Sequence, residues 1–228
     1  SALDAETIST LLASSRSRTA GGYDADFAER IDEFSEVVIA HPEDPTPRVA
    51  LAMAFLDFAN HRIATGRDPR FLLEDARREA EEAASRGASP AQTGMVRAWS
   101  AYLLGESAAA LELSTSAAQA LAKGDEEVVA RVLEVLARTA TSAIYAAESA
   151  GDDWPGDLLG RAHAAHRLLG ASPASTSALF SSHVDLLDYL GLVRQRGEAL
   201  DNALTAFGGD PDLHRRFRAH VEATAGPE

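Results

Sequence analysis

The 228-residue chain contains no cysteine. This absence excludes disulfides, thiolate catalysis and cysteine-ligated zinc or iron–sulfur centres. The chain also has no run of apolar residues that approaches the ~18 residues a membrane span needs. No charged-then-apolar segment opens the chain, so we expect a cytoplasmic protein without membrane insertion, with a removed signal peptide as the open alternative.

Aromatic residues are scarce, at 6% of the chain, whereas alanine supplies roughly one residue in five. Small side chains allow helices to approach one another closely, so this composition favours stacked helix pairs. Nothing in the sequence indicates a strand. We therefore predict an all-α protein.

Basic residues are also outnumbered by acidic residues, and the formal net charge is −14. Nucleic acid and anionic membranes would be repelled by such a chain unless a local basic patch overrode the mean. The densest basic cluster is Arg215, Arg216 and Arg218, which we expect to complement the dipole of the last helix. A protein or peptide partner is expected instead, with a basic segment the best match to the charge.

Proline and glycine mark where helices begin and end. Six of the nine prolines lie one residue past a candidate N-cap, a position that suits proline because its missing N–H leaves no bond unmade. Glycines close the segments, as expected just past helix C-termini. The prolines are Pro47, Pro69, Pro90, Pro155, Pro173 and Pro211; the glycines are Gly66, Gly87, Gly105, Gly124, Gly151, Gly170, Gly197 and Gly208.

Combined with apolar spacing, these signals predict about eleven helices. The expected segments are 4–18, 24–40, one from Pro47, 69–86, one from Pro90 to Gly105, its return helix to about Leu121, 125–150, 155–169, 173–196, 198–207 and 211–223.

The segments that connect one predicted helix pair to the next have similar sequences. Residues 86–90 and 169–173 are near copies, and residues 122–125 occupy the equivalent joint between them. One helical hairpin per repeat cannot bury its apolar face alone, so neighbouring hairpins must stack.

Residues 89–125 resemble a tetratricopeptide repeat. Ala98 and Tyr102 lie at the small and aromatic positions of a first helix, Gly105 makes the turn, and Ala110 starts the small-then-apolar pair of the second helix. Around Gly66 the resemblance is looser, with Phe71 replacing the usual alanine. The resemblance implies an α-solenoid of about five stacked antiparallel hairpins with a C-terminal capping helix, formed as one domain over residues 1–228. The alanine- and glutamate-rich stretch 60–84 also resembles repeats appended to bacterial kinases and regulators, which favours a fragment of a larger signalling protein.

No arrangement of residues predicts catalysis. His163 and His166 lie three apart on a helix, but no carboxylate–histidine ligand set accompanies them, so no metal is expected. His183 is close in sequence to Asp185 and Asp188, but Asp185 does not share the helix face that carries His183. Phosphate-binding loops and nucleophile elbows are absent. We therefore expect neither an enzyme nor a cofactor.

The candidate site follows from the repeat resemblance, which places the first helices of successive hairpins on a concave surface. Its predicted groove residues are Asn60, Met95, Trp99 and Tyr102, because aromatic and amide side chains are common anchors for peptides. Core packing is the alternative for Trp99. The expected function is a non-enzymatic interaction scaffold; the alternative is a helical sensor or small-molecule-binding domain of a larger bacterial regulator or kinase.

Overall fold

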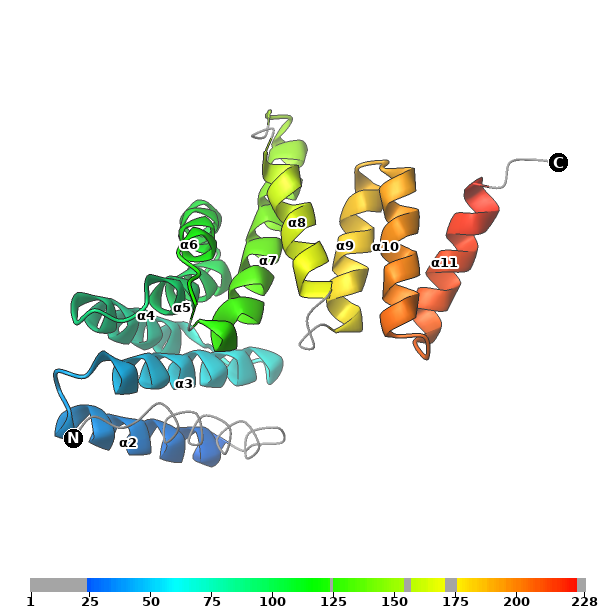
Figure 1. Ribbon diagram of the computed structural model, residues 1–228. Helices are drawn as coiled ribbons and strands as arrows, with labels where there is room; N and C mark the ends of the chain where they lie inside the picture. The colour runs from blue at the N-terminus through cyan, green and yellow to red at the C-terminus, as the bar shows by residue number, and fades with distance from the viewer. Residues whose placement is uncertain (1–23, 124, 154–156, 171–175, 225–228) are drawn as a thin grey trace. The chain divides into compact units, whose positions relative to one another are not determined.

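The computed structural model describes residues 24–123, 125–153, 157–170 and 176–224. Within these ranges it contains helices and no strand, which confirms the all-α prediction (Figure 1). The predicted helix 4–18 and the predicted starts at Pro155 and Pro173 lie outside the described residues, as does Gly124. The helices are α2 (Asp24–Ala40), α3 (Pro45–Ala64), α4 (Arg70–Ser85), α5 (Pro90–Leu103), α6 (Ser107–Gln119), α7 (Glu126–Ala150), α8 (Leu158–Gly170), α9 (Ser177–Tyr189), α10 (Val193–Ala206) and α11 (Pro211–Thr224).

Helix starts follow the capping signals, with small shifts. Asp44 caps α3 by accepting a hydrogen bond from the Thr46 N–H at 2.9 Å, so this helix begins at Pro45, two residues before the predicted Pro47. Ser89 caps α5 as predicted, accepting from the Gln92 N–H. An N-cap acceptor satisfies one of the donors that every helix start leaves unpaired.

One predicted boundary is wrong. The chain turns at Gly191, with φ +67°, rather than at Gly197, so the predicted segment 173–196 is divided between α9 and α10. Gly197 lies inside α10, where an added Cβ would stand 2.6 Å from Nε2 of His220 on α11. This glycine therefore permits close helix packing, a role that its sequence neighbourhood does not distinguish from helix termination.

The chain divides into two compact units, residues 1–135 and 136–228, with the boundary inside α7. The expectation of a single repeat domain stays a prediction.

In the first unit, α3 pairs with α4 and α5 pairs with α6, and α5 also contacts both α3 and α4. Close approach within the second pair depends on Gly94 of α5, where an added Cβ would stand 3.0 Å from the Ala117 Cβ of α6. The apolar residues that recur at helical spacing along α4 are all buried: Leu72, Leu73, Ala76, Ala80 and Ala83. Phe71, which replaces the alanine that is usual at this position of the repeat, is 52% exposed.

In the second unit, α9 contacts α8 and α10, and α10 contacts α11. Figure 1 shows α9, α10 and α11 side by side. Small apolar clusters among the described residues hold these helices together, for example around Val184, Leu187 and Leu200 and around Phe180 and Leu213.

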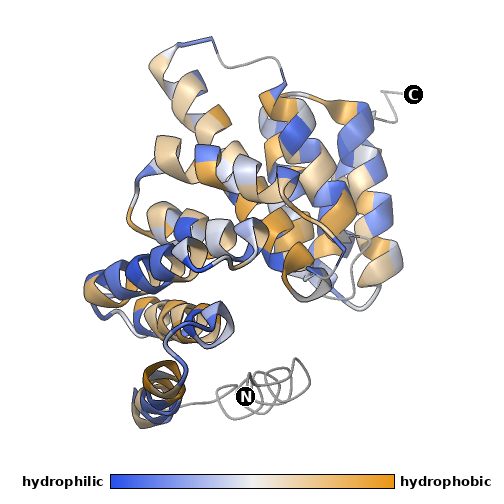
Figure 2. Ribbon diagram, turned by 60° about the vertical axis from the view of Figure 1, so that its left-hand side comes forward, coloured by the Kyte–Doolittle hydropathy of each residue, from blue (hydrophilic) through white to orange (hydrophobic). Residues whose placement is uncertain are grey.

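The helices drawn in Figure 2 carry both hydrophilic and hydrophobic residues, and none is hydrophobic throughout. Among the described residues, no helix is both long enough and apolar enough to cross a membrane.

Candidate functional sites

Trp99 lies where α5 meets α7, and it is half-buried. Its indole Nε1 donates a hydrogen bond to the backbone carbonyl of Arg131 at 3.3 Å. The ring of Tyr102 stands edge-on to it, with centroids 5.9 Å apart and an interplanar angle of 80°. Aromatic pairs prefer this geometry, and a buried indole N–H normally finds an acceptor. Trp99 is thus held in place from two sides while part of the ring stays accessible.

Arg131 also connects this position to α3. Its guanidinium donates to Asp57 at 3.2 Å, and the other oxygen of that carboxylate accepts from Arg30 of α2 at 2.8 Å. The Arg30 side chain is only 7% exposed and that of Asp57 is 23% exposed. Asp57 therefore joins α2, α3 and the first part of α7. We call the surface formed by Asp57, Asn60, Trp99, Tyr102 and Arg131 the first-helix surface.

The four predicted groove residues differ in exposure. Asn60 is exposed one turn beyond Asp57 on α3, and Trp99 and Tyr102 are both half-buried. Met95 has no exposed surface and belongs to the apolar core of the first unit. In this conformation a partner could touch the first three and not Met95, because Met95 lies beneath the surface.

Three histidines gather in the second unit. Nδ1 of His163 on α8 and Nε2 of His183 on α9 lie 3.0 Å apart, a hydrogen bond in which one imidazole donates. The ring of His166 stacks on that of His183, with centroids 4.6 Å apart and an interplanar angle of 6°. Its Nε2 lies 3.4 Å from Oγ1 of Thr141 on α7. His166 and His183 are each only 5% exposed.

Burial determines the charge of the His166 and His183 imidazoles. Loss of hydration lowers the pKa of His166 to about 4, helped by the proximity of His163 and Arg138. The same effect, with the two neighbouring histidines adding to it, lowers the pKa of His183 to about 3. Burial disfavours the charged imidazolium. Both rings are therefore neutral at pH 7.

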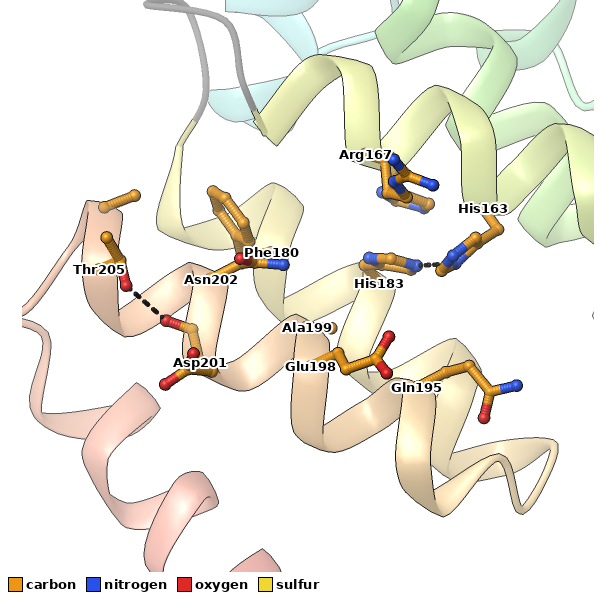
Figure 3. A pocket seen from close by; sticks show the side chains of 12 residues that line it. His163, Arg167, Phe180, His183, Gln195, Glu198, Ala199, Asp201, Asn202 and Thr205 are labelled. Carbon is orange, nitrogen blue, oxygen red and sulfur yellow. Dashed lines mark hydrogen bonds between the residues drawn. The ribbon is translucent and has the colours of Figure 1, made fainter.

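A pocket of about 690 Å³ opens beside the histidines. Figure 3 shows the side chains that face it. It is bounded by α8, α9 and α10, and it lies wholly within the second unit. Its lining consists of His163, His166, Arg167, Phe180, His183, Gln195, Glu198, Ala199, Asp201, Asn202, Thr205 and Ala206.

The acidic residues near His183 have other partners. Asp185 pairs with Arg216 of α11, and Asp188 pairs with Arg196 of α10. These carboxylates form ion pairs between helices. His183 contacts the other two histidines instead. Among the described residues, no group of three or more His, Asp or Glu side chains is arranged to hold a metal ion.

Sequence reasoning missed both the Arg30–Asp57–Arg131 cluster and the pocket. A spacing of three placed His163 and His166 on one face of a helix, but nothing in the sequence joined His183 to them. Asp57 gave no signal either, because its partners lie on α2 and α7. Contacts between helices that are far apart in the sequence leave no pattern among neighbouring residues.

No protein-family model matches this sequence, and no curated protein is similar enough to count as a relative.

Proposed function

We propose that this protein is a non-enzymatic interaction module whose first unit binds a peptide or protein segment on the first-helix surface. The proposal rests on the contact between α3 and α5, the first helices of two successive hairpins. Stacked hairpins place their first helices side by side and so build an extended binding surface. The tetratricopeptide-like solenoid remains part of this proposal.

The side chains of the first-helix surface suit a peptide. Trp99 and Tyr102 present partly accessible rings, and Trp99 is already fixed by its bond to Arg131. A rigid aromatic side chain offers contact area at a small cost in conformational entropy. Asn60, exposed on α3, can both donate to and accept from a peptide backbone. Trp99 also packs against the apolar cluster that contains the buried Met95.

The charge of the chain favours a basic partner. A net charge of −14 attracts basic segments over long range and repels nucleic acid. On the surface itself, Asp57 is already shared by Arg30 and Arg131, so the attraction comes from the whole chain more than from one carboxylate. That the protein needs no cofactor and catalyses no reaction stays a prediction.

Selection from a random-peptide display library with the full chain tests the proposal. We expect recovered peptides to share aromatic or basic residues and to bind at least tenfold more weakly to Asn60→Arg. Gln119→Arg is the matched control, because it makes the same amide-to-guanidinium change at an exposed position at the end of α6. Equal binding by the wild type and Asn60→Arg, or equal loss with both variants, would overturn the proposed surface.

A further inference from the structure

The pocket of the second unit has walls of opposite charge. Figure 3 shows His163 and Arg167 of α8 on one side and Glu198 and Asp201 of α10 on the other. His183 of α9 lies between them. Because the pocket belongs entirely to the second unit, it is independent of the first-helix surface.

The α8 side carries one permanent cation beside hydrogen-bonding imidazole rings. Arg167 is exposed and has no ion-pair partner among the described residues, so its guanidinium is available to a carboxylate. The adjacent His163 and His183 form a mutual hydrogen bond that occupies one nitrogen of each ring. The rings therefore add polar groups to this side of the pocket.

The α10 side is acidic. Glu198, Asp201, Asn202 and Thr205 recur at helical spacing and line the pocket together. Asp201 has no side-chain partner in the described part of the chain. Glu198 has only an exposed contact with Arg194 at 3.4 Å, one turn earlier. Such pairs contribute little, so both carboxylates remain available to a cation.

A ligand that pairs with both sides of the pocket carries a negative group for the α8 side and a positive group for the α10 side. A simple anion would meet the carboxylates of α10, and an apolar molecule would leave most of the lining unpaired. The volume of about 690 Å³ lies within the range of small-molecule sites. We propose that this pocket binds a small zwitterion, a short peptide with free termini, with its carboxylate at Arg167 and its ammonium at Asp201 and Glu198. The second unit would then act as a small-molecule sensor.

Ligand-observed NMR on the full chain tests this inference. The probe is a pool of free dipeptides varied in side chain, compared with the same pool N-acetylated or C-amidated. We expect the free pool to bind and each blocked pool to bind at least tenfold more weakly, because each block removes one charge.

Two variants test the assigned residues. Arg167→Gln and Asp201→Asn should each weaken binding at least tenfold, and both residues are exposed, so folding should be retained. Arg218→Gln and Glu222→Gln on α11 make the same changes of charge outside the pocket and should leave binding unchanged. Equal binding of free and blocked pools, or no binding of any pool at millimolar concentration, would overturn the inference.

Discussion

The two units are built from the same kind of helix pair, but they bury different chemistry. The first has a large apolar cluster that includes Leu56, Leu73, Met95 and Val132, and a smaller one around Phe34 and Leu51. The described part of the second has small apolar clusters around Leu200 and Leu213, and it also buries the stacked rings of His166 and His183.

This difference has a physical consequence. Apolar side chains do not titrate, whereas a core that includes imidazoles loses stability when the rings become protonated. The first unit is accordingly suited to present a fixed surface. The second combines a less uniform core with an open polar pocket, which suits a region that responds to a ligand or to acid.

Truncation of the first core should produce the largest effect. Met95→Ala removes a fully buried side chain, so we expect the free energy of unfolding of the first unit to fall by about 2–5 kcal/mol. Urea denaturation followed by Trp99 fluorescence, in a Trp154→Phe background, measures it. A loss below about 0.5 kcal/mol would show that Met95 is not core and would reopen the predicted groove assignment.

Acid should affect the second unit selectively. The unfolded chain takes up protons near pH 6.5, whereas folded His166 resists protonation down to about pH 4. The stability contributed by the neutral ring is therefore complete above pH 6.5 and is lost as pH falls toward 4, by roughly 3 kcal/mol for His166 alone. His183, with its pKa near 3, acts in the same direction.

Hydrogen exchange at pH 7 and pH 4.5 measures this acid effect helix by helix, with rates corrected for intrinsic pH dependence. We expect amides of α9 and α10 to lose protection and amides of α3 to α5 to keep theirs. His183→Phe, which keeps a ring without a titrating group, should reduce the loss. Equal loss of protection in both units would contradict the comparison.

Overpacking the second hairpin of the first unit should have an intermediate effect. Ala110 on α6 has no exposed surface, so Ala110→Leu should destabilise the first unit by about 1–3 kcal/mol. Ala109→Leu is the matched control at the neighbouring exposed position. Similar melting temperatures for the two variants would mean that the α5–α6 contact tolerates volume in a way that a tight helix pair does not.

The smallest expected effect concerns how Trp99 is held. Trp99→Phe keeps an aromatic ring but removes the N–H that donates to Arg131, so we expect a loss of about 1 kcal/mol. Tyr102→Phe removes only a hydroxyl, and we expect almost no change in stability. If Tyr102→Phe abolished peptide binding while the protein stayed folded, the hydroxyl would be assigned to recognition.

Local signals predicted much of the helical framework. Capping residues such as Ser89 and Asp210 act within one helical turn, and both are found where the sequence predicts a helix start. Positive-φ glycines such as Gly66 and Gly105 likewise act locally, because only glycine adopts this conformation without strain. Gly197 misled the prediction because it lies inside α10, where an added Cβ would stand close to His220 of another helix.

The all-α class, most helix boundaries and the apolar face of helices such as α4 follow from local sequence patterns, since these depend on interactions between residues a few positions apart. The burial of Met95 and the pairing of Asp57 with both Arg30 and Arg131 depend instead on the folded arrangement. It alone brought His183 to His163 and His166, and placed Arg167 opposite Asp201 across one pocket. Such pairs join helices whose separation in sequence is unrelated to their distance in space, so no periodicity records them.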